Sequence, residues 1–449
     1  MNLDGYALPI KKLKGTEPVE SLDLSGKNLG VASAIVIASL ISVSGSLTKM
    51  SLAENKLEEE GTKAICEALE QNKTLKELDI SGGYHSGSNI GGLAGAKHVA
   101  KMLGVNGGLT SIDVRQNYIA GDGAVQLAAA VLGNLKIEIF NKIPIKEMRT
   151  NSLTELDLGK YVGVEGFMVV AGLIPVMGSL TVTNLLGNRL DAESANMLAK
   201  VAKQKGISLC GIQRDQTTAD FSKKHLKPPD AILLASDLSQ AGVTGSLTAL
   251  DLSSNMLMDE GVSAVCEAIH SNKETKLTSL NFRNNVIGPV GANSVTAMVA
   301  VTGGLTALDL SSNILKDEGV SAVCKAIQSS KETKLASLNF GENDIGPVGA
   351  NAVAAMVAVT GSLTSVELRG NKLGDKGWGA IFAAICGNKD CKIMSMDTSY
   401  ENIGPAGGKL IAEALRTRAS QAQERHRHVD RVLPREQPQH GRGSAGLDL

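Results

Sequence analysis

The feature that most constrains this chain is an internal duplication in its C-terminal half. Residues 247–304 and 305–362 both begin Leu-Thr-Ala-Leu-Asp-Leu-Ser-Ser-Asn and stay nearly identical to their ends. Each block contains two units, because Leu277 and Leu335 open a second run of the form Leu-x-x-Leu-x-Phe-x-x-Asn. Units therefore recur every 28 to 30 residues. A period of that size indicates a solenoid of stacked units, not the three globular domains that about 150 residues per domain would suggest.

Each unit predicts one strand followed by one helix. In the unit that starts at Leu247, apolar residues alternate around Asp251, which is the period of a strand with one buried face. Gly261, Val265 and Ile269 then fall on one apolar helical stripe. Between strand and helix lies an asparagine, whose buried amide can satisfy backbone groups that the turn leaves unpaired. The recurring turn asparagines are Asn55, Asn117, Asn188, Asn255, Asn285, Asn313, Asn343 and Asn371.

The pattern Leu-x-x-Leu-x-Leu-x-x-Asn-x-Leu-x-x-x-Gly with a full helix resembles the ribonuclease-inhibitor-like subfamily of leucine-rich repeats. The resemblance extends over about residues 8 to 415. It implies an α/β horseshoe with parallel strands on the concave face and helices on the convex face. It also implies that the chain binds another protein, without a cofactor.

The repeat pattern divides the chain into a short start and a long array. Residues 1–18 are predicted to form an N-terminal capping strand segment. Within it we expect Leu8–Leu13 to be the truncated opening strand, because this segment aligns with Ile143–Met148 inside the array. The solenoid itself covers 19–415 and holds about 14 units in one elongated domain.

Three stretches of the array depart from the pattern, and the C-terminal end leaves it altogether. At 82–95 a glycine-rich insertion stands in place of the asparagine turn, and 137–152 predicts a strand with little or no helix. At 207–246 a short strand precedes a second unit with its own helix. Residues 416–449 contain seven arginines and little that could be buried, so we expect a disordered basic tail.

The six cysteines predict a reducing compartment. Cys66, Cys266 and Cys324 occupy one and the same helix position, and the last two lie two units apart, far beyond disulfide reach. We therefore expect free core thiols and a cytoplasmic protein, with the nucleus as an alternative. Cys386 and Cys391 have no histidine pair beside them, so a zinc site is not expected.

No sequence motif indicates catalysis, nucleic-acid binding or a membrane span. The chain contains no Gly-x-Ser-x-Gly elbow, no His-Glu-x-x-His and no complete phosphate loop. A formal net charge of -1 argues against a nucleic-acid partner. Uncharged stretches near the strands are interrupted by serine and glycine, so no transmembrane segment is expected. We expect a non-enzyme that needs neither metal nor cofactor.

The concave face is the candidate binding surface. The residue between the two buried positions of each strand should point out of it, and many of these residues are acidic. The candidate residues of this column are Asp79, Asp113, Asp157, Asp251, Asn281, Asp309, Asn339, Glu367 and Asp397, with Arg283 and Arg369 in the next column. Ideal strand spacing would make the carboxylates a continuous negative stripe. Two interpretations stay open: a docking groove for a basic partner, or a repeat consensus copied by duplication.

The leading functional hypothesis is a protein-binding scaffold that uses the concave face. Neighbouring concave positions are mostly Thr, Ser, Ala and Gly, whereas binding hot spots are typically Trp, Tyr and Arg, so a very tight grip is not expected. One alternative is a GTPase-activating protein of the Ran type, which carries the same class of repeat. The other is the sensor-repeat region of an intracellular immune-type receptor. Oligomeric state is left open.

Overall fold

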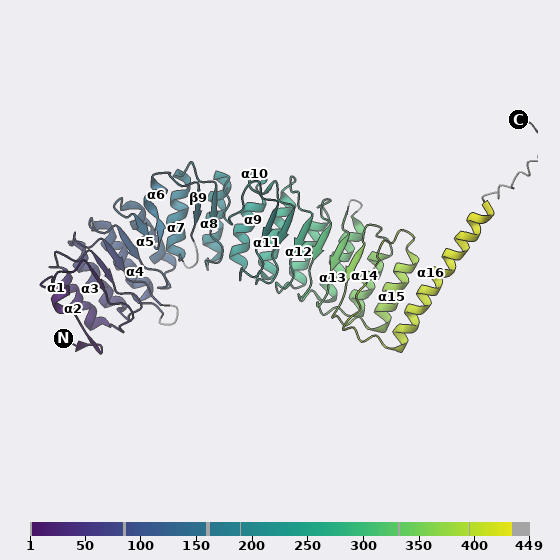
Figure 1. Ribbon diagram of the computed structural model, residues 1–449, viewed down its shortest axis with the longest axis horizontal. Coiled ribbons are helices and arrows are strands. Elements are labelled where there is room, and N and C mark those ends of the chain that lie inside the picture. Colours follow the sequence, from purple (N-terminus) through teal and green to yellow (C-terminus); the bar gives the residue numbers. More distant parts are fainter. Residues whose placement is uncertain are drawn as a thin grey trace, which may run out of the picture.

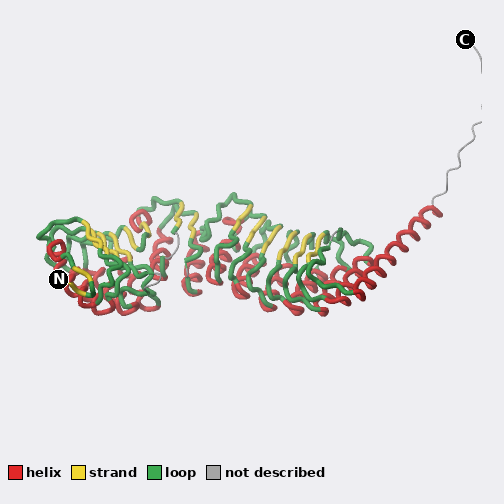
Figure 2. The backbone as a smooth tube through the Cα atoms, turned by 60° about the horizontal axis from the view of Figure 1, so that its bottom comes forward, coloured by secondary structure: helices red, strands yellow, loops and turns green. Residues whose placement is uncertain are grey.

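The computed structural model describes residues 2–83, 87–158, 162–188, 190–330, 333–394 and 396–432. In this part of the chain, strands and helices alternate along one elongated array (Figure 1). Strands line one face of the array and helices line the opposite one, and we call these the strand face and the helix face (Figure 2). The predicted α/β solenoid is confirmed.

The elements follow the repeat. Up to residue 149 they are β1 (Asn2–Leu3), β2 (Tyr6–Ala7), α1 (Ile10–Lys14), β3 (Ser21–Asp23), α2 (Val31–Ile41), β4 (Lys49–Ser51), α3 (Glu58–Glu70), β5 (Glu77–Asp79), α4 (Gly92–Val105), β6 (Ser111–Asp113), α5 (Gly121–Gly133), β7 (Ile139–Phe140), β8 (Ile143–Pro144) and α6 (Ile145–Arg149). From residue 155 they are β9 (Glu155–Asp157), α7 (Val164–Leu173), η1 (Ile174–Val176), β10 (Val182–Asn184), α8 (Ala192–Lys205), β11 (Thr218–Asp220), α9 (Pro228–Leu238), α10 (Ala241–Thr244), β12 (Ala249–Asp251), α11 (Met258–Ser271), β13 (Ser279–Asn281), α12 (Pro289–Val299), β14 (Ala307–Asp309), α13 (Lys316–Ser329), β15 (Ser337–Asn339), α14 (Pro347–Val357), β16 (Ser365–Glu367), α15 (Gly374–Gly387) and α16 (Pro405–Val432).

The strands of the array form three sheets in succession, not one. Strands β3 to β8 make a six-stranded sheet, β9 and β10 a pair, and β11 to β16 a second six-stranded sheet. Inside each sheet, equivalent positions of the repeat pair directly, as Leu250, Leu280, Leu308 and Leu338 do. These leucines are buried, so the period-2 pattern of the sequence places one side of every strand in the core.

The repeat glycine lets adjacent helices approach closely. A Cβ on Gly319 at the start of α13 would lie 3.0 Å from the Cβ of Ala292 on α12. That separation is tighter than nine in ten real Cβ contacts, so a side chain at this position would require the neighbouring helix to move by a few tenths of an ångström. The apolar stripe of each helix, such as Val320, Val323 and Ile327 on α13, then reaches the strands and is buried.

The opening of the array differs from the expectation. Leu8–Leu13 is not a strand: β1 and β2 form an antiparallel hairpin, and the short helix α1 follows. The reason is local, because Pro9 precedes Ile10 and fits the entry of a helix better than a strand that must donate hydrogen bonds. The segment nonetheless packs as an end cap, with Leu13 fully buried.

The same cap occurs a second time inside the array. Strands β7 and β8 form an antiparallel hairpin that ends at Pro144, and α6 is again a helix of five residues. The expected strand with little helix at 137–152 is therefore a hairpin followed by one turn of helix. Strand β8 ends the first six-stranded sheet, and a proline there fits an edge strand. The internal duplication thus includes the N-terminal cap.

The C-terminal segment also differs from the expectation. The prediction of disorder from residue 416 does not match the structure as far as Val432, because α16 continues without interruption from Pro405. Residues 416–432 contain no Gly or Pro, and their five arginines, two alanines and two glutamines all favour helix. Beyond the last repeat the helix extends away from the array (Figure 1). Residues 433–449 lie outside the described residues.

None of the helices in the described part of the chain has the length and apolarity that crossing a membrane would require.

Candidate protein-binding face

The turn asparagines form a buried ladder that runs beneath the strand face. Asn313 is typical: its Oδ1 accepts the N–H groups of Asn285 and Ile287, at 2.9 and 3.1 Å. Its Nδ2 donates to the carbonyls of Leu310 in its own unit and Phe282 in the preceding one. All eight predicted asparagines are buried. They are structural, since each one joins neighbouring units.

The structure adds ladder members that the sequence pattern did not reveal. Asn89 replaces the missing asparagine of the glycine-rich insertion and donates to the carbonyl of Leu52 at 2.8 Å. Asn141 accepts the N–H of Val114, and Glu401 closes the ladder by accepting the N–H of Asn371. The glycine-rich insertion moves Asn89 away from the expected spacing, so the repeat pattern did not reveal it. The available signal was an asparagine shortly before a helix.

Asn313→Ala should lower the free energy of unfolding by about 2 kcal/mol, because it leaves several buried backbone groups without a partner. Urea unfolding followed by circular dichroism measures the change. Asn351→Ala, at an exposed position of α14, is the matched control and should have little effect. Equal effects of the two substitutions would contradict the ladder role.

The predicted acidic column exists, but its side chains also close the strand ends. Oδ1 of Asp251 accepts the N–H of Ser253 at 2.8 Å, and Asp309 does the same for Ser311. Asp79 and Asp113 form the same turn in the first sheet, and so do the amides of Asn281 and Asn339. These local hydrogen bonds give the residues of the column a structural role. For most of them, this supports the interpretation that the acidic residues are a repeat consensus copied by duplication.

Pairing within the column reduces its negative character. Asn281 donates to Oδ2 of Asp251 at 3.1 Å, and Asn339 donates to Oδ2 of Asp309 at 3.2 Å. Asp113 forms an ion pair with Arg115 at 2.7 Å. The two sheet breaks divide the column as well, with Asp157 and Asn184 in the middle pair. The carboxylates therefore do not form one continuous stripe.

One further residue of the acidic column, Asp220, lies beside the break before β11 and was not predicted from the sequence. Asp220 pairs in register with Asp251 and is exposed. The signal was weak because Ala219 and Phe221 replace the leucines that mark other strands.

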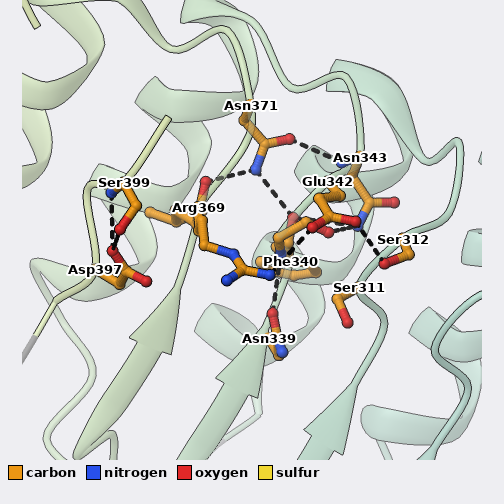
Figure 3. Close-up of polar contacts among 12 residues, drawn as sticks. Ser311, Ser312, Asn339, Phe340, Glu342, Asn343, Arg369, Asn371, Asp397 and Ser399 are labelled. Atoms are coloured by element: carbon orange, nitrogen blue, oxygen red, sulfur yellow. Dashed lines mark hydrogen bonds and ion pairs between the residues drawn. The ribbon is translucent and has the colours of Figure 1, made fainter. Parts of the chain in front are cut away.

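The most concentrated polar cluster of the strand face lies around Arg369, near the C-terminal end. Figure 3 shows Arg369 between Glu342 and Asp397. Its Nη2 lies 3.2 Å from Oε1 of Glu342, whose Oε2 accepts a hydrogen bond from Ser312 at 2.9 Å. The Ser312 hydroxyl and the guanidinium groups of Arg369 and Arg283 hold the pKa of Glu342 below its usual value.

A cavity of about 240 Å³ opens in this cluster. Its lining residues are Arg283, Ser311, Ser312, Asn339, Gly341, Glu342, Glu367, Arg369 and Asp397. The predicted residues Arg283, Asn339, Glu367, Arg369 and Asp397 thus meet at one place. Asp397 accepts hydrogen bonds from Ser399, which lower its pKa. It lies in a segment without an assigned strand, held to β16 by the bond from Gly370 N–H to the Ser399 carbonyl.

Tyr400 contacts Arg369 of this cluster, and Met394 precedes Asp397 by three residues in the sequence. The Arg369 guanidinium lies 6.0 Å from the centre of the Tyr400 ring, and Tyr400 is 80% exposed. Met394 is 91% exposed. Tyr, Arg and Met are enriched at protein interfaces. Tyr400 was not among the predicted positions of the face, because it follows the strand position instead of occupying it.

A second, larger cavity of about 610 Å³ lies at the break before β11. Asp157, Asn184 and Gly187 line one side, and Asp220, Phe221, Lys223, Lys224 and His225 line the other, with Cys210 between them. The unit that begins at Ile207 has no helix of its own, because the chain passes from Ile212 to β11 within a few residues. The cavity occupies the place where a complete unit would have its loop.

No metal centre is found in the described residues. They contain no group of three or more histidine, cysteine or acidic side chains placed to hold a metal ion. Burial raises the pKa of the thiols of Cys66, Cys266 and Cys324, so these core cysteines are poor nucleophiles.

Comparison with known proteins supports the repeat assignment. The family model described as leucine-rich repeat matches five segments of the C-terminal half, namely 246–266, 273–295, 305–324, 331–354 and 362–382. The chain is 24% identical to mouse (Mus musculus) ribonuclease inhibitor over 311 residues, which cover 69% of this chain and 61% of that protein. It is 24% identical to human (Homo sapiens) NACHT, LRR and PYD domains-containing protein 5 over 361 residues, 80% of this chain and 27% of that protein.

The chain thus spans less than two thirds of these relatives. A solved structure of an internalin from Listeria monocytogenes aligns over 88% of this chain and 90% of its own length, with 14% identity and a TM-score of 0.31. The repeat length, the asparagine ladder and the sequence relatives agree with one another: the five matched segments are leucine-rich repeats, and the array is similar to those of the ribonuclease-inhibitor-like type.

Proposed function

We propose that the protein is a non-enzymatic scaffold that binds a partner protein on its strand face, with the Arg369 cluster at the centre of the interface. The observation that carries the proposal is the cavity of about 240 Å³ where Arg283 and Arg369 meet three carboxylates beside the exposed Tyr400. Arginine and tyrosine dominate binding hot spots when they become buried by a partner. The carboxylates of Glu367 and Asp397, which line this cavity, favour a partner with a basic contact surface.

The proposal also covers the compartment and the wider context of the chain. All six cysteines are free thiols, which supports the cytosol or the nucleus. The alignment of 80% of this chain with a quarter of a protein whose name includes LRR domains supports a second candidate role. In that role the array is the recognition region of a larger receptor-type assembly.

The test is affinity capture from native extract, followed by titration of the partner that mass spectrometry identifies. Removing both anchors in R369A/Y400A should weaken binding at least about 30-fold, which corresponds to loss of about 2 kcal/mol. The matched control is Arg115→Ala, because Arg115 occupies the equivalent column in the first sheet and is held by Asp113. Equal affinities of the wild type and R369A/Y400A, with folding verified by circular dichroism, would refute the assigned centre.

A further inference from the structure

Strand β11 has a free edge in the interior of the array. It is the first strand of its sheet, and no ladder joins it to an earlier strand in the described residues. In β12 the N–H groups of Thr248 and Ala249 both donate to the carbonyl of Thr217, at 2.7 and 3.2 Å. The pairs Thr278/Ser279, Thr306/Ala307 and Thr364/Ser365 each donate to one carbonyl of the preceding strand in the same way. Thr217 and Thr218 hold this position in β11.

The segment before β11, which includes Leu209 and Cys210, does not pair with this edge, because its backbone N–H groups point toward the core. Asp237 of α9 is fully buried and accepts the N–H groups of Leu209 and Cys210, at 2.8 and 3.1 Å. Both Thr218 and Asp220 are exposed as a result. One edge group is covered from within the chain: Nε2 of Gln216 donates to the carbonyl of Thr218 at 2.7 Å.

The free edge leads into the cavity of about 610 Å³ described above. Since the strands of this sheet are parallel, the cavity lies at the carboxyl end of β11, where Asp220 and Phe221 join its lining. Its volume falls within the range of about 300–1,000 Å³ that is usual for ligand sites. A strand placed along β11 in the sheet's own direction would therefore end in the cavity.

The charges along this path change sign in a defined order. Asp220 comes first on one side of the cavity, Lys223, Lys224 and His225 follow it on the same side, and the carboxylate of Asp157 lies on the opposite side. Hydrogen bonds from Ser222, together with Lys224 and Lys223, hold the pKa of Asp220 below its usual value. A strand in this place meets a carboxylate before it meets the lysines. This order fits a peptide with a basic side chain followed by a terminal carboxylate.

We propose that the edge of β11 and the adjoining cavity bind the C-terminal segment of a partner protein in extended conformation, added as a strand parallel to β11. One carbonyl of that segment accepts the N–H groups of Thr217 and Thr218. Its basic side chain lies beside Asp220, and its terminal carboxylate lies among Lys223, Lys224 and His225. Main-chain bonds supply affinity in such strand addition, and the side-chain and carboxylate contacts supply selectivity.

This site is separate from the proposed Arg369 cluster. It belongs to the first strand of the second six-stranded sheet, whereas the cluster lies around the last one. Either site can therefore fail in experiment while the other holds.

The test starts with a random heptapeptide library displayed with free C-termini and selected on the full chain. Enriched peptides, synthesised with a fluorophore at the N-terminus, are titrated by fluorescence anisotropy. We expect Lys or Arg to be enriched upstream of the C-terminus. Amidation of the carboxylate should weaken binding about tenfold or more, as loss of a charged hydrogen bond does. Hydrogen exchange should slow at the amides of Thr217 and Thr218 when peptide binds.

Two substitutions isolate the contacts. Thr218→Pro removes one edge N–H that the sheet does not use, so the fold should survive and peptide binding should be lost. Asp220→Lys should weaken binding at least about tenfold through like-charge repulsion, whereas Asp251→Lys, in the same register on the next strand, should not. Gln216→Ala, which uncovers the Thr218 carbonyl, should strengthen binding.

Four outcomes would overturn the proposal. The first is a library that shows no enrichment on the full chain. The second is a set of peptides that bind Thr218→Pro as tightly as the wild type. The third is equal affinity of the acid and the amide forms of each peptide. Loss of binding in Asp251→Lys but not in Asp220→Lys would place the peptide elsewhere on the strand face and would also count against it.

Discussion

Replacing Arg149 with alanine is expected to lower the free energy of unfolding by about 3 kcal/mol. The Arg149 guanidinium donates four hydrogen bonds to carbonyls at the end of α5 and just beyond it. The acceptors are the carbonyl oxygens of Val131, Leu132, Asn134 and Ile137, at distances of 2.8 to 3.1 Å. Hydrogen bonds to a charged donor contribute about 1.5–3 kcal/mol each, and bonds that share one donor do not add fully.

The physical basis is the helix end. The last carbonyls of a helix have no partner within it and carry a partial negative charge, which a cation stabilises. Arg149 belongs to the second cap, so this side chain fastens the cap to the helix before it. We expect the lost stability to appear first as faster hydrogen exchange of amides in the last turn of α5.

Arg149→Lys is the matched control for this prediction. It keeps the charge but replaces the planar fork by a single ammonium group, so it should restore less than half of the loss. Urea unfolding of the three proteins by circular dichroism provides the comparison. Full restoration by lysine would show that charge alone matters, and an unchanged midpoint in Arg149→Ala would contradict the role of the four bonds.

The second large effect is a fall in stability between about pH 5 and pH 8, which two buried carboxyl groups cause. Burial raises the pKa of Glu165 to about 7 and that of Asp237 to about 7. Both values are well above about 4, where these groups titrate in an unfolded chain. The folded state therefore binds their protons more tightly. Their contribution is fully present below about pH 4 and is lost as the pH rises through about 7.

Glu165→Gln should remove the Glu165 part of this dependence and leave the Asp237 part, because glutamine stays neutral at every pH and still accepts from Nδ2 of Asn141 through its amide oxygen. In the wild type, Glu165 should lower the free energy of unfolding by on the order of 3 kcal/mol between pH 5 and pH 8. The variant should not show this part of the decrease. Glu147→Gln, on the exposed side of α6, is the matched control and should leave the slope unchanged. Urea unfolding at both pH values measures the slopes. Parallel curves for wild type and Glu165→Gln would show that Glu165 is ionised in the fold throughout.

The regular part of the fold could be predicted from the sequence because one set of contacts is copied in every unit. Leu308 and Asn313 each stand for a column of equivalent residues, and an error at one copy is corrected by the others. The prediction was wrong where a unit lost that redundancy. Leu8–Leu13 has a single counterpart in the chain, and its alternation of apolar and polar residues suits a strand as well as a helical turn.

The candidate site was predicted only as a set of positions. The period of the strand placed Asp309, Asn339 and Glu367 on one face, as the structure shows. It could not show that Asn339 donates a hydrogen bond to Asp309, or that Arg369 turns toward Glu342, because such choices depend on side-chain torsions. Tyr400 was not predicted because it follows the strand position. The exposed edge of β11 was not predicted because a break in strand pairing does not change the spacing of the repeat residues in the sequence.

The two interruptions of the strand ladder have a mechanical consequence. In the sheets β3–β8 and β11–β16 every strand forms main-chain hydrogen bonds with its neighbour. Each of these two blocks therefore resists bending. Between residues 144 and 218 those bonds are interrupted twice, while helix contacts from α5 through α7 and α8 to α9 continue. Elastic compliance is therefore concentrated in this short stretch. A load applied at the two ends of the array would be absorbed there, and both blocks would keep their shape.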